Sequence, residues 1–221
     1  MPISKISNKK IIFGGSFAYY YDKKRKYFIK VCKGQREWIE KEYNNLKKYW
    51  NKLNVKNLNL IRPIKYSKKL EFLVTELIEG KRLVDILIPE IYYNFGKKLK
   101  EFHANGFSHS HLEFQDVLFD KNSKIYYIAD VPFFNKFPPI HDLATIKVSF
   151  YMYRYKKPWN FYRYNICFNA FLQGYGVYNK KELEKEYRKS IEGRIRYLIK
   201  RGKLNKIRGI LMNIMYKLGL L

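Results

Sequence analysis

A lysine and a glutamate stand where two opposite charges could meet inside the fold. Lys30 lies in the strand-like run KYFIKVC with apolar residues on both sides, where a lysine is costly unless its ammonium meets an anion. Glu42 follows in the next helix-like segment and could pair with it. Either residue alone reads as ordinary surface charge, but their order, strand lysine and then helix glutamate, favours a pair. Such a lysine suits phosphoryl transfer, which requires that the nucleotide phosphates be bound and held in position.

A glycine pair near the N-terminus is a second candidate for phosphate binding. Gly14 and Gly15 precede Ser16 in a predicted strand-turn-strand segment. Without side chains, two glycines let backbone N–H groups approach phosphate oxygens closely. The same three residues also fit a plain hairpin turn, so the motif leaves both interpretations open.

The elements that would position these residues alternate in the first third of the chain. KIIFGGSFAYYYD and KYFIKVC predict a hairpin, and LIRPIKYS and LEFLVTELIEG predict two further strands. Between them, GQREWIEKEYNNLKKYWNKL predicts a helix, because its apolar residues recur at a nearly helical spacing. These apolar positions are Trp38, Ile39, Tyr43, Leu46 and Trp50.

From Glu79 and Gly80 onward the pattern becomes helical. RLVDIL predicts a helix, and IPEIYYNFGKKLKEFHANG predicts another that ends at Gly106, a typical C-cap residue. Two short strands follow around the turn DKNSK, and the chain after Asp142 reads as helix again. The sequence therefore predicts two lobes, a strand-rich one over residues 1–79 and a helical one over residues 80–221.

The segment FHANGFSHSHLEFQDVLFDKNSKIYYIAD resembles the catalytic and metal-binding loops of the kinase superfamily. In that family a helix ends in His-x-x-Gly, a His-Gly-Asp-Leu loop follows, and two apolar strands lead to a metal-binding Asp. The positions that match are His103, Gly106, His109, Leu112, Val117–Asp120 and Asp130, followed by His141-Asp142-Leu143-Ala144. The pattern is most similar to a short, atypical branch, the lipopolysaccharide core heptose and Kdo kinases, with RIO-type and tRNA-modification kinases as more distant relatives.

The resemblance implies a two-lobed α+β protein-kinase-like fold, with a small antiparallel β N-lobe and a mainly helical C-lobe, that uses ATP and Mg²⁺. Within it, Thr75 would lie beside the adenine, and the backbone of Glu76 and Ile78 would hydrogen-bond to it. Asp116 and Asp130 would hold the metal ion, since carboxylate oxygens suit a hard cation.

The sequence departs from the family where catalysis is concerned. His111 stands at the position of the catalytic Asp, and Asp116 stands at the position of the metal-binding Asn. An imidazole can accept a proton near neutral pH but does not supply the same negative charge. His103, His109 and His111 also allow a zinc site, although histidines at the first two positions hold the loop in the family.

Three functions remain open from the sequence. The first is a kinase that phosphorylates a hydroxyl of a lipopolysaccharide core sugar or a similar glycolipid, with His111 in the catalytic position. The second is a pseudokinase that serves as a nucleotide-binding or scaffold module, because the catalytic Asp is replaced. The third is an RNA-linked kinase, favoured by the basic tail.

The charge of the chain predicts an anionic partner. Its 221 residues include 45 Lys and Arg against 19 Asp and Glu, a formal net charge of +26. A membrane surface, an anionic glycolipid or nucleic acid would suit this excess, unless it reflects composition alone. The tail from Lys180 either packs on the domain with a solvated basic side or lies on an anionic membrane. Its helical apolar face comprises Ile207, Ile210, Leu211, Ile214, Met215 and Leu218.

Cysteine usage and the N-terminus predict where the protein resides. Cys32 and Cys167 are far apart, which supports neither a disulfide framework nor a cysteine zinc site. The N-terminus lacks the apolar run of a signal peptide, and no long apolar stretch is present. A cytoplasmic protein, with or without peripheral contact to the inner membrane face, is expected. The sequence leaves the oligomeric state open.

Overall fold

The structure is a computed structural model that describes residues 12–14, 17–22, 26–32, 36–156, 158–176, 178–200 and 203–217. It separates into two compact units. The first contains the described residues up to Ile86 together with Lys98–Phe107 and Gln115–Phe134. The second contains Leu87–Lys97, Ser108–Phe114 and the described residues from Asn135 onward.

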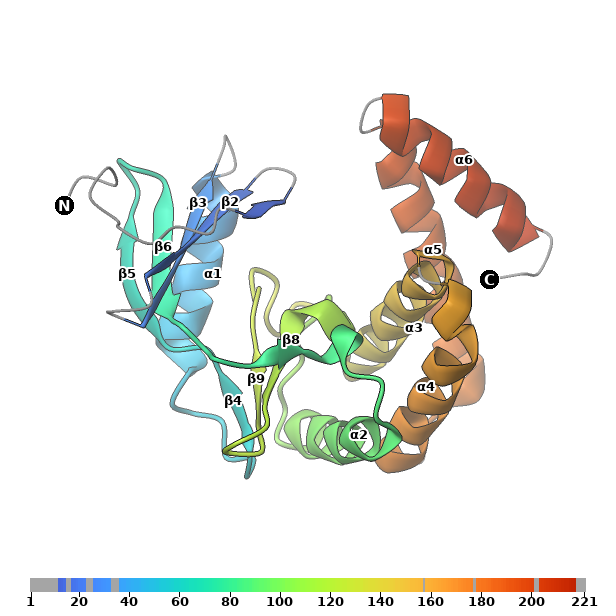
Figure 1. Cartoon of the computed structure of the whole chain (residues 1–221), viewed down its shortest axis with the longest axis horizontal. Coiled ribbons are helices and arrows are strands. Elements are labelled where there is room, and N and C mark those ends of the chain that lie inside the picture. Colours follow the sequence, from blue (N-terminus) through green and yellow to red (C-terminus); the bar gives the residue numbers. More distant parts are fainter. Residues whose placement is uncertain are drawn as a thin grey trace. The chain divides into compact units, whose positions relative to one another are not determined.

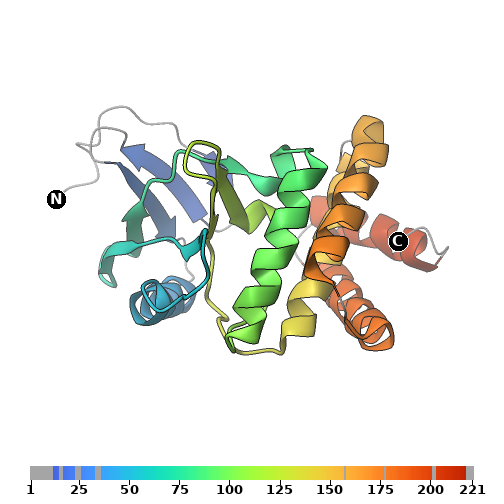
Figure 2. The ribbon, with the colours of Figure 1, turned by 90° about the horizontal axis from the view of Figure 1, so that it is seen from below.

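A five-stranded antiparallel sheet forms the larger part of the first unit, in the order β1-β2-β3-β6-β5. Its strands are β1 (Ile12–Gly14), β2 (Phe17–Asp22), β3 (Tyr27–Cys32), β5 (Pro63–Ser67) and β6 (Phe72–Glu76). The expected hairpin of β2 and β3 is confirmed, with Asp22 opposite Tyr27. The predicted helix is α1 (Arg36–Tyr49), which packs along β5 and β6 on one face of the sheet (Figures 1 and 2).

A second, four-stranded sheet completes the first unit, in the order β4-β9-β8-β7. Its strands are β4 (Leu58–Leu60), β7 (Lys81–Arg82), β8 (Val117–Asp120) and β9 (Ile125–Ile128). The helix predicted for RLVDIL is wrong: these residues form the end of β7 and the single 3-10 turn η2 (Leu83–Asp85). The segment is held by pairing of Arg82 with Leu118, a partner far along the sequence. Leu83 and Val84 are buried.

An aromatic cluster fixes the segment that follows β9. Phe134 packs on Tyr49 of α1 with ring centroids 4.8 Å apart, and on Phe102 and Phe107 at 5.8 and 5.9 Å. Phe102 belongs to the last turns of α2 (Pro89–Ala104). Gly106 follows that helix in the left-handed region, with φ 80°, and its N–H donates to the carbonyl of His103, as a helix terminus of this kind requires.

Helices make up most of the second unit. They are α3 (Pro139–Lys156), α4 (Phe161–Tyr175), α5 (Lys180–Lys200) and α6 (Lys203–Lys217), with the short 3-10 turns η3 (Phe114–Asp116) and η4 (Pro158–Asn160) elsewhere in the chain. α3 contacts both α4 and α5, and α6 folds back beside α5 (Figure 1). The start of α2 is joined to α4 by stacking of Phe95 on Phe171, at 5.9 Å between centroids.

Two glycines let α2 and α4 approach each other closely, so a larger residue at either position should destabilise the protein. A Cβ on Gly174 would collide with the backbone of Tyr93, and a Cβ on Gly96 would collide with that of Phe171. We expect Gly174→Ala to lower the free energy of unfolding by about 1–3 kcal/mol, because rigid helix backbones must separate. Urea unfolding measures this.

The matched control for that substitution is Gly193→Ala. Gly193 lies within α5 and has no heavy atom within 4 Å of the position of an added Cβ. Alanine there should raise the free energy of unfolding by about 0.5–1 kcal/mol through helix propensity. Equal effects of the two substitutions would contradict the close approach of α2 and α4.

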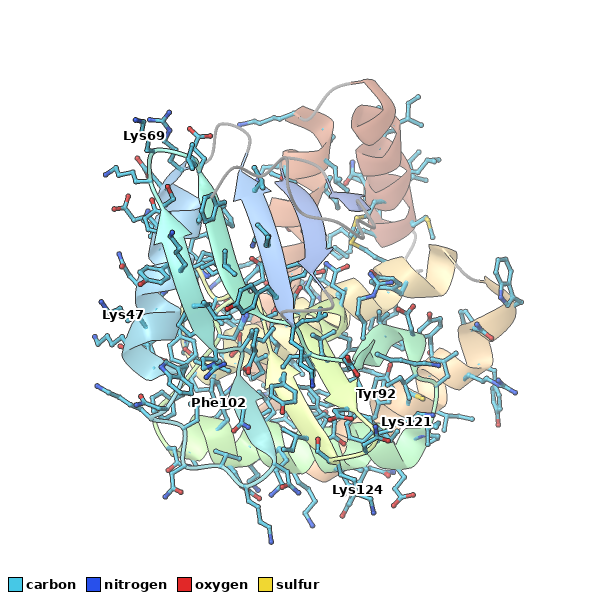
Figure 3. The ribbon with its side chains drawn as sticks, turned by 60° about the vertical axis from the view of Figure 1, so that its left-hand side comes forward. Lys47, Lys69, Tyr92, Phe102, Lys121 and Lys124 are labelled. Atoms are coloured by element: carbon cyan, nitrogen blue, oxygen red, sulfur yellow. The ribbon has the colours of Figure 1, made fainter. Side chains whose placement is uncertain are left out.

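Lysine side chains are distributed over the first unit rather than confined to one element. Figure 3 shows Lys47 on α1, Lys69 at the turn after β5, and Lys121 and Lys124 at the turn between β8 and β9. None of the helices in the described part of the chain has the length and apolar character needed to cross a bilayer.

Candidate active site

Lys30 lies at the centre of a charged cluster in the first unit. Its Nζ atom is 2.6 Å from Oε2 of Glu42 and 2.7 Å from Oδ1 of Asp130. The side chains of Lys30 and Glu42 are each 7% exposed, whereas that of Asp130 is 50% exposed. The pairing expected for Lys30 and Glu42 is present, and the structure adds Asp130 to it. The cluster thus joins strand β3, helix α1 and the loop after β9.

The electrostatics of the cluster keep Lys30 charged. Burial alone would lower the pKa of Lys30, but the negative charges of Glu42 and Asp130 outweigh it and raise that pKa well above its usual range. A permanently positive ammonium beside a half-exposed carboxylate suits a site for a metal-bound phosphate.

The loop after β9 is held in an unusual backbone conformation. Asp130 has φ 58°, in the left-handed region that is rare for residues with a side chain. Strained backbone of this kind is concentrated at functional sites. The amide of Asn45 donates to the carbonyl of the next residue, Val131, at 2.8 Å. Asn45 was not predicted, although its place one helical turn after Glu42 puts both residues on one face of α1.

Asp116 and Asp130 flank the open end of the β8–β9 hairpin. Val117 pairs with Ile128, and the N–H of Ala129 donates to the carbonyl of Asp116 at 2.9 Å. Asp116 therefore stands beside the residue that precedes Asp130. Carboxylate oxygens are donors that suit Mg²⁺. The backbone bond places Asp116 near the segment that carries Asp130, and the assignment of the two residues to a metal ion stays a prediction.

The segment predicted to bind adenine ends strand β6. Thr75 is buried, and its hydroxyl donates to the carbonyl of Glu76 at 3.2 Å. The N–H of Glu76 donates to the carbonyl of Arg62 at 3.0 Å. The role predicted for the backbone of Glu76 and Ile78 in binding adenine stays a prediction. Gly14 ends β1, whereas Gly15 and Ser16 lie outside the described residues.

In the second unit, Asp142 holds the loop that carries His111. The N–H of His109 donates to Oδ2 of Asp142 at 2.7 Å, and the N–H of Leu112 lies 3.4 Å from Oδ1. Asp142 is completely buried near the start of α3. One turn later, the Thr145 hydroxyl donates to the carbonyl of Leu112 at 2.8 Å. The resemblance to the family included Asp142-Leu143-Ala144, but it did not predict that Asp142 accepts hydrogen bonds from the loop of His111.

Ser110 anchors the same loop from its inner side. The residue is fully buried and has φ 70°. Its hydroxyl oxygen accepts the N–H groups of Lys136 and Phe137 at 2.9 and 2.8 Å. The sequence offered little signal for this role, because the bonds depend on a segment far along the chain. With Ser110 and Asp142 fixed, the backbone on both sides of His111 is held in place.

His111 itself is half-exposed and lies beside a buried carboxylate. Its side chain is 47% exposed, and Nε2 lies 3.6 Å from Oε1 of Glu113, which also lies 3.3 Å from Nη2 of Arg194. Burial lowers the pKa of His111, Glu113 opposes this, and Arg194, His109 and His141 add to it. The net lower pKa favours the neutral imidazole, which can accept a proton. Glu113, two residues from His111, was not predicted.

The zinc site considered for the three histidines is not formed. Among the residues that the structure describes, no group of three His, Cys, Asp or Glu is arranged to hold a metal ion. His103 and His109 are both buried. His103 contributes its carbonyl to the end of α2, and His109 contributes its N–H to Asp142. Their backbone contacts agree with a structural role.

Several solved structures are similar to this chain. An aminoglycoside phosphotransferase from Streptomyces rimosus aligns with a TM-score of 0.62 at 10% identity, over 83% of this chain and 92% of that one. An aminoglycoside phosphotransferase of the 2″-IIa type, solved with streptomycin and ATP, gives 0.59 at 14% identity, over 93% and 90%. A choline/ethanolamine kinase family protein from Mesorhizobium loti gives 0.53 at 10%, over 84% and 76%.

The amino-acid sequence itself matches no protein-family model and no curated protein. At the identities found for the solved structures, the likeness concerns the fold alone. It agrees with the mixed architecture of a small antiparallel sheet and a helical part that was expected from the sequence.

Proposed function

We propose that this chain, which has a protein-kinase-like fold, is an ATP-dependent phosphotransferase that acts on a hydroxyl of a glycan or glycolipid, such as a lipopolysaccharide core sugar. The observation that carries the proposal is the buried contact of Lys30 with Glu42 and Asp130. A strand lysine paired with a helix glutamate and a metal-binding aspartate is the arrangement that kinases use to hold ATP phosphates. Structural neighbours that are phosphotransferases support the same class of reaction.

Each cluster has a distinct task in this proposal. The ammonium of Lys30 would bind phosphate oxygens, and Asp116 and Asp130 would hold Mg²⁺, which would neutralise charge on the phosphates. Glu42 keeps Lys30 in place, and the backbone of Glu76 and Ile78 binds adenine. His111 accepts the proton of the acceptor hydroxyl as that oxygen bonds to the γ-phosphorus and ADP leaves. Glu113 steadies the resulting imidazolium.

The glycan acceptor rests on the resemblance of residues 103–130 to the core sugar kinases and on the net charge of +26. A phosphorylated core glycolipid is anionic, so a basic protein attracts it. The structural neighbours act on other small molecules, aminoglycosides among them, and so bear on the reaction rather than the acceptor.

The second candidate function is a pseudokinase, favoured by His111 at the position of the catalytic Asp. Such a protein would bind magnesium ATP without transferring phosphate. Binding and transfer are separable measurements, because ligand binding raises the melting temperature whether or not turnover occurs.

A substitution at His111 decides between the two functions. For an active kinase, His111→Ala should lower phosphate transfer from radiolabelled ATP to core glycolipid by about 10²–10⁴-fold, the usual contribution of a proton acceptor. The rise in melting temperature with magnesium ATP should persist, since Lys30 and Asp130 are unchanged. Phosphate transfer and the rise in melting temperature are compared with those of the wild type and of His111→Gln.

The opposite results are equally informative. A wild type that binds magnesium ATP but transfers nothing, together with transfer by His111→Asp, would establish the pseudokinase. Absence of both thermal stabilisation and transfer in all variants would exclude nucleotide-dependent function of either kind. Transfer to glycolipid that is unchanged by His111→Ala would remove His111 from the mechanism.

A further inference from the structure

The helix α6 presents an apolar stripe to solvent. Ile207, Ile210, Leu211 and Ile214 are 52%, 44%, 54% and 48% exposed. Their spacing of three and four residues places them in one row along the helix. Scattered exposed apolar residues are normal on a soluble protein, but a continuous row of branched aliphatic side chains indicates a surface that contacts something else.

The opposite face of α6 is already used for packing within the protein. Gly209 lies so close to α5 that an added Cβ would press on the side chain of Ile199 and approach the carbonyl of Ile195. Met212, on the same face, is 8% exposed. α6 is thus docked on α5 through one face, and the isoleucine-rich row is a different face. The expectation that the tail simply packs on the domain therefore accounts for only half of the helix.

Positive charges predominate in the sequence of α6 and of the end of α5. From Gly193 to Leu221 the sequence contains no Asp or Glu, while it contains many Lys and Arg. Of these, Lys200 and Lys217 are exposed, as is Arg196, which lies 3.9 Å from Glu192. Tyr197, also on α5, is 47% exposed. An exposed apolar row on a helix of basic sequence is typical of helices that lie in the interface of an anionic bilayer.

We propose that the exposed row of α6, with the exposed basic residues Arg196, Lys200 and Lys217, docks on a membrane surface rich in anionic phospholipid. Charge complementarity selects this occupant. A second copy of the chain would bring a net charge of +26 against the same charge, which opposes pairing of the two rows. Nucleic acid would satisfy the cations but leave the aliphatic row in water, since bases are bound by stacking on aromatic rings.

Membrane docking through α6 is a property separate from the proposed phosphotransferase reaction and does not depend on it. Docking through α6 would hold the protein at the surface where glycolipids are found, whichever acceptor it uses. Vesicle binding and phosphate transfer are measured separately, so failure of one does not imply failure of the other.

The test uses the full chain and vesicles of phosphatidylcholine with about one quarter phosphatidylglycerol, compared with vesicles of phosphatidylcholine alone. Because each basic residue near an anionic surface adds roughly one kcal/mol, binding should be at least about tenfold tighter to the anionic vesicles. It should weaken as salt increases. Co-sedimentation and tryptophan fluorescence measure the binding.

A matched pair of double variants isolates the apolar row. Ile210→Ser with Leu211→Ser removes two of its side chains, which are 44% and 54% exposed. Ile88→Ser with Leu70→Ser removes one isoleucine and one leucine of similar exposure, 43% and 49%, outside α6. The first variant should bind anionic vesicles at least about tenfold more weakly, because each buried CH₂ contributes ~0.8 kcal/mol. The second should bind like the wild type. Circular dichroism and melting temperature confirm that both fold.

Three results would overturn the proposal. The first is equal binding to neutral and anionic vesicles, or to neither. The second is equal binding by the two double variants. The third is a wild type that sediments as a dimer and becomes a monomer on Ile210→Ser/Leu211→Ser substitution, which would assign the row to a second copy instead.

Discussion

Lys30→Met is expected to lower the free energy of unfolding at pH 7 by about 3–5 kcal/mol and to abolish both stabilisation by magnesium ATP and phosphate transfer. The substitution leaves Glu42, which is 7% exposed, without its cation. An unpaired buried charge is far more costly than an unpaired exposed one. The loss of nucleotide binding follows because the ammonium that would hold the phosphates is gone.

The stability of this variant should depend on pH in a defined direction. Burial raises the pKa of Glu42 and the ammonium of Lys30 opposes that rise, so removing Lys30 raises the pKa further. Between the unfolded value, about 4.3, and the raised folded value, the folded state keeps a proton that the unfolded state has lost. Stability therefore falls as pH rises through this window. The deficit relative to the wild type should be smaller at pH 5 than at pH 7.5.

Two controls separate stability from function. Lys147→Met removes a lysine whose partner Glu184, at 2.8 Å, is 46% exposed, and should cost no more than about 1 kcal/mol. Lys30→Met combined with Glu42→Leu replaces the buried pair with apolar groups and should recover most of the lost stability. It should recover neither the thermal shift with magnesium ATP nor phosphate transfer. Recovery of the thermal shift would show that Lys30 does not hold nucleotide.

Asp142→Ala is expected to be the second severe change, with a loss of about 2–5 kcal/mol in the free energy of unfolding. The buried N–H groups of His109 and Leu112 lose the carboxylate that accepts them. A buried donor left unpaired costs about 1–3 kcal/mol. Hydrogen exchange should accelerate at both amides, and phosphate transfer should fall because the loop that carries His111 is released.

The control for Asp142 is Asp120→Ala. Asp120 also accepts two hydrogen bonds, from the N–H of Asn122 at 2.9 Å and the hydroxyl of Ser123 at 2.7 Å. Both bonds lie at an exposed turn, where water can take the place of the carboxylate, so the cost should stay under about 1 kcal/mol. Stabilisation by magnesium ATP should survive in both variants, since Asp142 belongs to the unit that lacks Lys30 and Asp130, and Asp120 lies at an exposed turn. Equal costs of the two substitutions would contradict the role of Asp142.

Local patterns in the sequence predicted those parts of the structure that depend on neighbouring residues. Helix α1, the hairpin of β2 and β3, and the end of α2 before Gly106 follow from periodicity and turn residues. The approach of Lys30 to Glu42 was also predictable, because the helix directly follows the strand. A buried lysine demands an anion, and that helix carries Glu37, Glu40 and Glu42, of which Glu42 is the buried one.

Features that depend on distant partners could not be read in the same way. The contact of Lys30 with Asp130 joins residues a hundred positions apart. Residues 81–85 have a helix-like pattern, but strand pairing with β8 overrides it. The close approach of Gly96 and Gly174 depends on which helices pack together. Propensity is a weak guide where tertiary contacts decide the conformation.

The bonds that tie α1 to the loop after β9 have a consequence for ligand affinity. Glu42 and Asn45 bond to Lys30 and Val131, so the helix, the strand and the loop after β9 are tied to one another. When only a fraction of the protein molecules is in the conformation that binds the ligand, the observed dissociation constant equals the intrinsic one divided by that fraction. Here folding itself selects the conformation. The affinity of the wild type for nucleotide should then depend only on the contacts between nucleotide and protein. Asn45→Ala removes the bond to Val131 that holds the loop, so it should weaken nucleotide binding although Asn45 contacts no phosphate.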